Sequence, residues 1–411
     1  MKTFIMLGWR NLWRQKRRSL VVIFSITLGV LMMMFALGLM NGIITQMLDN
    51  SISTKLGHLV VHKKGFFENM KLETNFYPDQ RILRAMKSDP DIVASAPRVK
   101  AFAMIRTGES SRGLIVLGVY PELEKKVSKM NEYTLADEGG SFLDDPDANE
   151  IMISKSLAEK LDVLVGDKIV LILQDSKSEM AGVGLTVRGL FQTPVADYDN
   201  SVAYMGIKRL QNITGLGNNI SEIMVVATGK EAVDSIKPRL TAAIGDASLE
   251  VMTWKDMAPN LVSAVRMIDS MLYIYYAIFF ITVVFSIANT LIMSIMERFH
   301  EIGVMKSIGT RPSQIFFIIM FEAVNLGLVG LTAGIVCGVI LLQVLQFTGL
   351  DFSLFMDAMR QWGAGSIIYP FLYPKDYIIT ILVVELTTCI AAIYPAVKAA
   401  RIKPLDALHY V

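Results

Sequence analysis

Residues 292–309 read IMSIMERFHEIGVMKSIG, an apolar run that breaks into a short charged segment, and a second apolar run begins at Ile315. Apolar residues recur at every third position of the charged segment: Met296, Phe299, Ile302, Met305 and Ile308. Gly309 and Pro312 are typical helix-ending residues. The stretch therefore predicts a short amphipathic helix between two membrane spans. This helix is either a connector that lies on the membrane surface or a binding surface for another protein.

The composition outside this stretch is that of a membrane protein. The chain has 411 residues, of which 53% are hydrophobic and 19% are charged, and its formal net charge is only +2. A bilayer-spanning helix needs about 20 predominantly apolar residues. Four segments meet this length: 20–44, 271–293, 315–345 and 377–397.

The distribution of Lys and Arg predicts the orientation of these spans, because cytoplasmic loops carry an excess of both. Basic residues cluster in 1–19, in the 294–314 segment and in the 398–411 tail. The 346–376 loop has only Arg360 and Lys375. Both termini are therefore expected to be cytoplasmic, with 45–270 and 346–376 on the other side.

The 45–270 region alternates strand-like and helix-like patterns, which predicts a large two-lobed α+β domain with an inserted lobe at about 119–184. The predicted strands are 57–62, 100–106, 113–119, 168–173, 185–190 and 222–227, and the predicted helices are 80–87, 155–161 and 231–244. Ser156 followed by Glu159 resembles a capping box. The 1–19 segment is predicted to be an amphipathic helix on the cytoplasmic side, with Trp9 and Trp13 on one face and arginines opposite.

Sequence motifs for chemistry are missing. No G-x-x-x-x-G-K-[ST] phosphate-binding loop, H-E-x-x-H, C-x-x-C or G-x-S-x-G pattern occurs. His58 and His62 are better explained as strand residues than as metal ligands, and Cys337 and Cys389 lie in apolar runs. We predict no catalytic residue, no metal site and no nucleic-acid partner. Glu322 and Glu385, which lie within the third and fourth apolar segments, are each expected to make an interhelical hydrogen bond or to face a partner subunit.

Three separated motifs resemble one family. ERFHEIGVMKSIGTRPSQI (297–315) is similar to the E-R-x-x-E-I-G-x-x-x-A-x-G-A core of MacB/FtsX-type ABC transporter permeases, with Ser307 and Thr310 as departures. YPAVKAARIKPLDALHYV (394–411) resembles the closing pattern of these permeases, and WRNLWRQKRRSL (9–20) resembles their N-terminal helix. The length and the four spans resemble the LolC/LolE permeases of lipoprotein release most, as do two looser stretches at 186–207 and 251–274.

The resemblance implies a permease subunit that works by mechanotransmission, with no cofactor of its own. A separate cytoplasmic ABC ATPase dimer would bind ATP and Mg and hydrolyse the nucleotide. The 294–314 segment would be its coupling helix, with these contact residues: Glu297, Arg298, Glu301, Met305, Lys306 and Gly309. A second permease protomer, identical or paralogous, would complete the transporter in the bacterial inner membrane.

The resemblance also implies a substrate, an acylated lipoprotein taken from the outer leaflet and passed to a periplasmic acceptor. Candidate residues for a hydrophobic cradle between the first two spans are Phe35, Leu39, Met267, Met271 and Tyr275. These residues could equally pack against membrane lipid or the partner permease. Two other functions remain open: MacB-like efflux of a peptide, toxin or drug, and ATP-gated regulation of a periplasmic partner.

Overall fold

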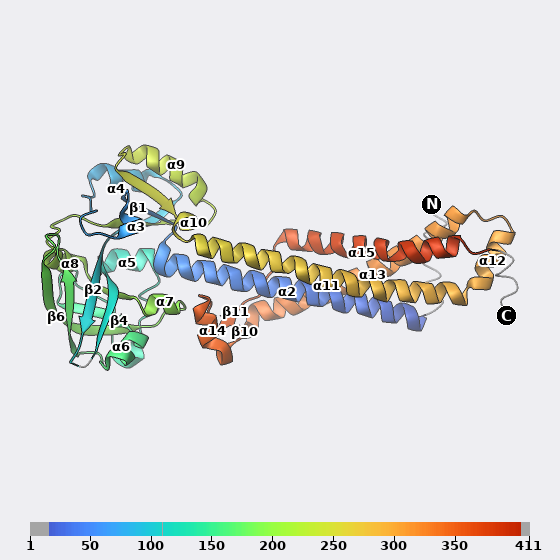
Figure 1. Ribbon diagram of the computed structural model, residues 1–411, viewed down its shortest axis with the longest axis horizontal. Helices are drawn as coiled ribbons and strands as arrows, with labels where there is room; N and C mark the ends of the chain where they lie inside the picture. Colours follow the sequence, from blue (N-terminus) through green and yellow to red (C-terminus); the bar gives the residue numbers. More distant parts are fainter. Residues whose placement is uncertain (1–15, 109, 404–411) are drawn as a thin grey trace. The chain divides into compact units, whose positions relative to one another are not determined.

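The computed structural model describes residues 16–108 and 110–403 (Figure 1). The predicted amphipathic helix at 1–19 and the end of the 398–411 tail thus lie almost wholly outside the described residues. The chain divides into two compact units. A helical unit comprises 1–44, 264–351 and 367–411, and an α+β unit comprises 45–263 and 352–366.

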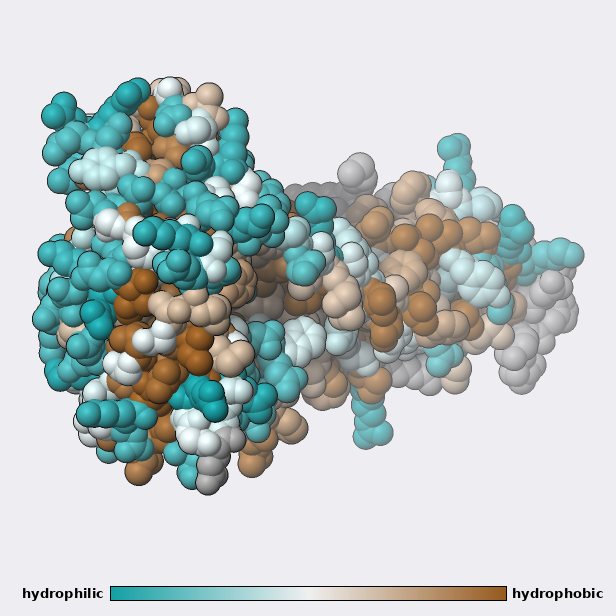
Figure 2. Space-filling view, turned by 60° about the vertical axis from the view of Figure 1, so that its left-hand side comes forward, coloured by the Kyte–Doolittle hydropathy of each residue, from teal (hydrophilic) through white to brown (hydrophobic). Residues whose placement is uncertain are grey.

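Among the described residues, four long helices are apolar enough to cross a membrane: α2 (Lys16–Ser51), α11 (Pro259–Glu297), α13 (Pro312–Thr348) and α15 (Pro374–Ala400). Each contains one of the four predicted spans. Hydrophobic residues gather on the surface of these helices, whereas hydrophilic residues cover most of the α+β unit (Figure 2). The helices α13 and α15 lie side by side (Figure 1).

Glycines on α13 allow the helical unit to pack closely, because small residues let helix backbones approach one another. A Cβ atom built on Gly330 or Gly334 would lie 2.7 Å from the Cβ atom of Ile26 or 2.6 Å from that of Val30, both on α2. On another face of α13, a Cβ atom on Gly327 would lie 2.9 Å from Cγ2 of Thr388 on α15. Larger side chains at these positions would therefore push α2 or α15 away.

The α+β unit is built on a nine-stranded sheet in the order β3-β7-β4-β6-β5-β2-β8-β1-β9. Its strands are β1 (Leu59–Lys63), β2 (Ile92–Arg106), β3 (Ser111–Val119), β4 (Glu150–Ser154), β5 (Lys168–Gln174), β6 (Met180–Phe191), β7 (Val202–Gly206), β8 (Glu222–Ala227) and β9 (Leu249–Thr253). The six predicted strands all exist, and β4, β7 and β9 are additional.

The long strand β2 belongs to two parts of this sheet. Its first half, from Ile92 to Arg98, pairs antiparallel with β8, which continues through β1 to β9. Its second half pairs with β3 on one side and β5 on the other, so that β2, β3, β7, β4, β6 and β5 close into a ring. Alternate residues of the ring strands, such as Ala101, Ala103 and Ile105, point into one apolar core. The ring uses strands from both sides of the predicted 119–184 lobe.

The helices of the α+β unit are mostly short. Within 45–263 they are α3 (Phe66–Asn69), α4 (Gln80–Ser88), α5 (Pro121–Val127), α6 (Lys155–Leu161), α7 (Ala196–Asp199), α8 (Ile207–Thr214), α9 (Val233–Ile244) and α10 (Trp254–Met257), with a π-helical turn at Ile52–Leu56. The predicted capping box at Ser156 is wrong. Ser154 is the N-cap residue of α6, because its hydroxyl accepts a hydrogen bond from the backbone N–H of Leu157 at 3.1 Å.

The predicted loop at 346–376 has structure of its own. β10 (Leu350–Asp351) pairs with β11 (Ile367–Ile368), and a 3₁₀ turn (Ser353–Phe355) and α14 (Met356–Gln361) lie between them. The residues between the two strands, Phe352–Ser366, belong to the α+β unit, not to the helical unit.

Candidate functional sites: the α12 segment and the groove between α2 and α11

The charged stretch between α11 and α13 forms a helix, α12 (Phe299–Ser307), which Gly309 ends. Gly309 has a φ of +99°, a backbone conformation that residues with a Cβ atom rarely adopt. The backbone N–H of Thr310 donates to the carbonyl of Met305 at 3.0 Å, and that of Gly309 donates to the carbonyl of Lys306 at 3.1 Å. This pair of bonds is a Schellman motif, so Gly309 fixes where α12 stops and where the chain turns toward α13.

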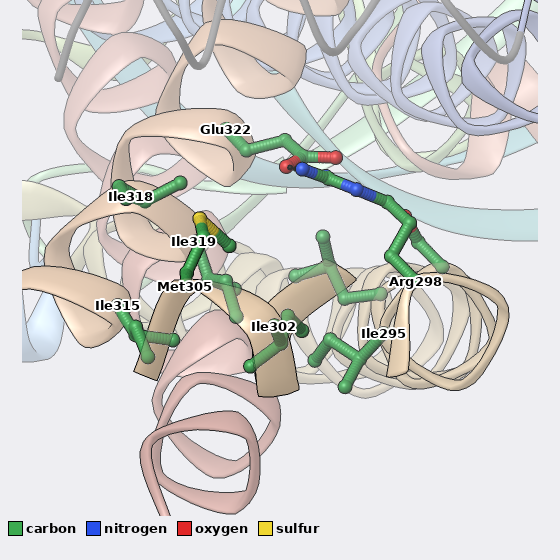
Figure 3. Close-up of a pocket in the computed structure, with 10 residues that line it drawn as sticks. Ile295, Arg298, Ile302, Met305, Ile315, Ile318, Ile319 and Glu322 are labelled. Atoms are coloured by element: carbon green, nitrogen blue, oxygen red, sulfur yellow. Dashed lines mark hydrogen bonds and ion pairs between the residues drawn. The ribbon is translucent and has the colours of Figure 1, made fainter. Parts of the chain in front are cut away.

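Arg298 connects α12 to α13. Its Nε donates to Glu301 Oε2 at 3.2 Å. Its Nη1 donates to Glu322 Oε2 at 3.2 Å, and Figure 3 shows the Arg298 and Glu322 side chains pointing toward each other. The Glu322 side chain is 10% exposed and that of Arg298 is 17% exposed. Removing either partner of a largely buried ion pair leaves an uncompensated charge, which makes the Arg298–Glu322 contact the more important of the two. The expected interhelical bond of Glu322 is therefore present, whereas Oε1 of Glu385 is buried without a hydrogen-bond partner among the described residues.

Lys306 connects α12 to the end of α15. Its Nζ donates to the carbonyl oxygens of Ala400 at 2.9 Å and Ile402 at 2.5 Å. A cation at a helix C-terminus satisfies carbonyl groups that lack an intrahelical partner and interacts favourably with the helix dipole. Arg298 and Lys306 thus connect α12 to α13 and to the C-terminal end of α15.

An apolar cluster reinforces these polar contacts. Ile295, Ile302, Ile315 and Ile319 are buried together with Ala396 and Ala399 of α15, and Phe299 and Met305 pack against them. Figure 3 shows Met305 and the isoleucines of α11, α12 and α13 pointing into the same space, with Arg298 and Glu322 above them. The inner face of α12 thus packs against the other helices of the helical unit.

The outer face of α12 carries a different set of residues. Val304 and Ile308 are exposed, Ile308 by 79%, and they follow Glu297 and His300 at helical spacing. Of the predicted contact residues, only Glu297 and Glu301 reach this exposed side, whereas Arg298, Met305 and Lys306 face inward and Gly309 shapes the turn. The sequence prediction passed over Val304, for which the only signal was its position one helical turn before Ile308.

A groove lies between α2 and α11 in the helical unit. It has a volume of about 220 Å³ and is lined by Gly29, Met32, Met33, Ala36, Leu37, Leu272, Tyr275, Tyr276, Ile278, Phe279 and Thr282. Its wall is apolar apart from the hydroxyl groups of Tyr275, Tyr276 and Thr282. Gly29 makes the two helices meet at one end, since a Cβ atom there would lie 2.6 Å from Cε2 of Phe279.

The structure brings one of the five predicted cradle residues into this groove. Tyr275 lines it, whereas Phe35, Leu39, Met267 and Met271 do not. Met267 and Met271 are half exposed on α11, at positions eight and four residues before Tyr275. Among residues 16–108 and 110–403, no group of three or more His, Cys, Asp or Glu side chains is arranged to hold a metal ion.

Two known family models match this chain. The model of the MacB-like periplasmic core domain matches residues 19–243, more than half of the chain, and the model of the FtsX-like permease C-terminal region matches residues 273–404. The chain belongs to the MacB/FtsX family of permeases. The helices α12, α13 and α15 lie within the FtsX-like match. The 297–315 motif that resembles these permeases therefore includes α12, the helix that Arg298 and Lys306 connect to α13 and α15.

Relatives of this MacB/FtsX permease match it over nearly their full length. The lipoprotein-releasing system transmembrane protein LolC of Neisseria meningitidis is 26% identical over 98% of both chains. LolE of Haemophilus influenzae is 22% identical over 99% of both chains. An uncharacterised ABC transporter permease of Methanocaldococcus jannaschii is 24% identical over 98% of this chain and 97% of its own. These homologues are permease subunits, not enzymes.

Two solved structures are similar to part of this permease. The periplasmic region of MacB from Actinobacillus actinomycetemcomitans has a TM-score of 0.35 and 14% identity, covering 53% of this chain and 97% of its own. The extracellular domain of YknZ from Gram-positive bacteria has a TM-score of 0.33 and 16% identity, covering 47% of this chain and 98% of its own.

Proposed function

We propose that this permease works by mechanotransmission and extracts acylated lipoproteins from the outer leaflet of the bacterial inner membrane. The observation that carries the proposal is the apolar groove between α2 and α11, two helices that are long enough to cross a membrane. In a bilayer, the open side of this groove would face the lipid. Relatives of the whole chain are named lipoprotein-releasing system transmembrane proteins. Acyl chains would enter the groove from the bilayer, and the lipoprotein's polypeptide would remain outside it.

The topology that accompanies this proposal places both termini in the cytoplasm. The outer α+β domain would then occupy 45–270, and the 294–314 segment and the 398–411 tail would face the cytoplasm. The division of the outer domain is part of the same proposal. The ring of β2, β3, β7, β4, β6 and β5 would form one lobe, and the part with β1, β8 and β9 the other.

The α12 segment would receive force from a separate cytoplasmic ATPase dimer, which binds ATP and Mg. The exposed Val304 and Ile308 would contact the ATPase. Because Arg298 bonds α12 to Glu322 and Lys306 bonds it to the end of α15, a push on α12 would move α13 and α15 together with α11. A second permease protomer would pair with the second ATPase subunit, and a soluble periplasmic protein would accept the released lipoprotein.

The test uses this permease with its co-purifying ATPase in liposomes, together with a triacylated lipoprotein. Release of that lipoprotein to a soluble acceptor is expected to require ATP and to fail for a version that lacks acyl chains. Release that occurs equally with and without acyl chains would favour MacB-like efflux. ATP-gated binding of a partner without any release would favour regulation of a periplasmic partner.

Filling the groove gives a sharper version of this test. Ala36→Phe places a large side chain in the groove, so we expect the rate of lipoprotein release to fall at least tenfold while ATP hydrolysis remains. The matched control is Ala277→Phe, which makes the same change at an exposed α11 position outside the groove. Equal release rates for the two variants would show that acyl chains do not use the groove.

A further inference from the structure

The 352–366 segment connects β10 to β11 and is part of the α+β unit, although its neighbours on both sides belong to the helical unit. Its two ends are joined, because the backbone N–H of Phe352 donates to the carbonyl of Ser366 at 2.7 Å and β10 pairs with β11. Beyond these strands the chain continues into α13 through Gly349 and into α15 through residues 369–373. The segment is therefore a closed loop whose base is covalently attached to both helices.

A buried ion pair holds this segment on the rest of the α+β unit. Arg360 Nη2 donates to Asp199 Oδ2 at 2.6 Å, and Arg360 Nε donates to the carbonyl of Thr193 at 3.2 Å. The Asp199 side chain is 1% exposed and that of Arg360 is 16% exposed. Asp199 also accepts hydrogen bonds from the backbone N–H of Thr193 at 3.1 Å and from its hydroxyl at 2.7 Å. The carboxylate is thus prepared by its own unit, and the guanidinium from the segment completes its surroundings.

Two hydrogen bonds anchor the C-terminal end of the segment. Asn50 Nδ2 donates to the carbonyl of Gly363 at 2.9 Å, and the backbone N–H of Gly365 donates to Gln46 Oε1 at 3.1 Å. Ala364, between the two anchored residues, is fully buried. Asn50 and Gln46 belong to the last turns of α2, so the segment is bonded both to the sheet side of the unit and to the helix that enters it.

We propose that the 352–366 segment transmits motion between the α13–α15 helix pair and the α+β unit, with the Arg360–Asp199 ion pair as the bond that makes the connection rigid. The inference rests on the proposed mechanotransmission and adds a second path to it. The chain already connects the units through α2 and α11. Because α13 and α15 carry the contacts of Arg298 and Lys306 from α12, this second path begins at the same coupling segment.

The protonation state of Asp199 makes the connection sensitive to pH. Burial raises the pKa of Asp199 to about 6, although hydrogen bonds from Thr193 and the charge of Arg360 act in the opposite direction. Thr193 holds the carboxylate within its own unit, so release of the segment removes the charge of Arg360 but not the burial, and the pKa of Asp199 is then higher still. The bound state has the lower pKa of the two, so the bound segment is most favoured above the pKa of the released state and loses its ion pair as the pH falls through about 6. We expect backbone amide exchange in 352–366, normalised for its intrinsic pH dependence, to increase at least fivefold between pH 7.5 and pH 5. Asp199→Asn is expected to remove this pH dependence.

The decisive experiment compares Arg360→Ala with Asp357→Ala, an exposed residue of the same helix, in the complete transporter with its ATPase. Amide exchange without nucleotide reports whether the segment is bound. Arg360→Ala is expected to raise exchange in 352–366 at least tenfold, whereas Asp357→Ala changes it less than twofold. Unchanged exchange in Arg360→Ala would refute the role of the ion pair.

The second measurement is the change in exchange that ATP causes in the remainder of the α+β unit. We expect Arg360→Ala to reduce this change at least threefold while the basal rate of ATP hydrolysis and the bound ATPase remain as in the parent protein. A full ATP response with a released segment would refute transmission through 352–366. This readout needs no substrate. Failure of the parent protein to release lipoprotein would therefore count against the proposed function alone, and the exchange data would still decide whether the segment transmits motion.

Discussion

Gly334→Leu is expected to reduce the free energy of unfolding by about 3 kcal/mol, at the upper end of the cost of overpacking a well-packed core. A Cβ atom on Gly334 would lie 2.6 Å from the Cβ atom of Val30 and 3.1 Å from the carbonyl oxygen of Thr27. Both neighbours lie on α2: Val30 is fully buried, and Thr27 is half-buried with its hydroxyl donating to the carbonyl of Gly330 on α13. A leucine can therefore be accommodated only if α2 moves away from α13. The measurement is the melting temperature of the purified permease in detergent, together with its yield from the membrane.

The control for this prediction is Val336→Leu. Val336 lies two residues further along α13 and is exposed by 53%, so a larger apolar side chain there has only lipid or detergent to displace. We expect a change of less than about 0.5 kcal/mol, as for most surface substitutions. Equal melting temperatures for Gly334→Leu and Val336→Leu would show that the close contact between α2 and α13 does not contribute to stability.

The features of the fold that the sequence predicted were those that depend on local pattern. Apolar runs are long enough to identify four membrane-length helices. Gly309 marks the end of α12 because glycine readily adopts a positive φ, and Pro312 marks the start of α13 because the fixed φ of proline suits the first turn of a helix. The strands β4 and β7 were missed for an equally local reason. They are five residues long and almost continuously buried, so they lack the alternation that distinguishes a strand from other short apolar runs.

The candidate sites were less predictable, because a side chain's role depends on partners far away in the chain. Nothing near Lys306 shows that its ammonium group is used by carbonyls at Ala400 and Ile402. Likewise, Arg360 is one of two basic residues in the 346–376 loop, and nothing near it in the sequence indicates its partner Asp199, which is 161 residues away. Residue type alone suggested that charged side chains of α12 contact a partner. The geometry turns two of them, Arg298 and Lys306, inward and leaves apolar Val304 and Ile308 outside.

Replacing both Val304 and Ile308 with lysine is expected to abolish ATP-driven transport and to release the ATPase from the purified complex. These side chains are the exposed apolar part of α12, and an apolar contact that becomes charged at an interface must bury unpaired ammonium groups. The fold itself should tolerate the change, because both positions are exposed and cations near a helix C-terminus are favourable. The measurements are the amount of ATPase that co-purifies and the rate of ATP-dependent lipoprotein release.

Two controls separate loss of the contact from loss of structure. Val93→Lys combined with Leu164→Lys makes a matched double change at exposed apolar positions of the α+β unit, outside the 294–314 segment, and should retain the ATPase. Ile302→Ala removes a buried side chain from the inner face of α12 and should lower the melting temperature by an amount that corresponds to about 2–5 kcal/mol. The double lysine variant is expected to melt with the parent protein and yet to lose the ATPase. If it retains the ATPase and transports at the parent rate, the exposed face of α12 does not couple the permease to ATP, and the force must enter at another surface.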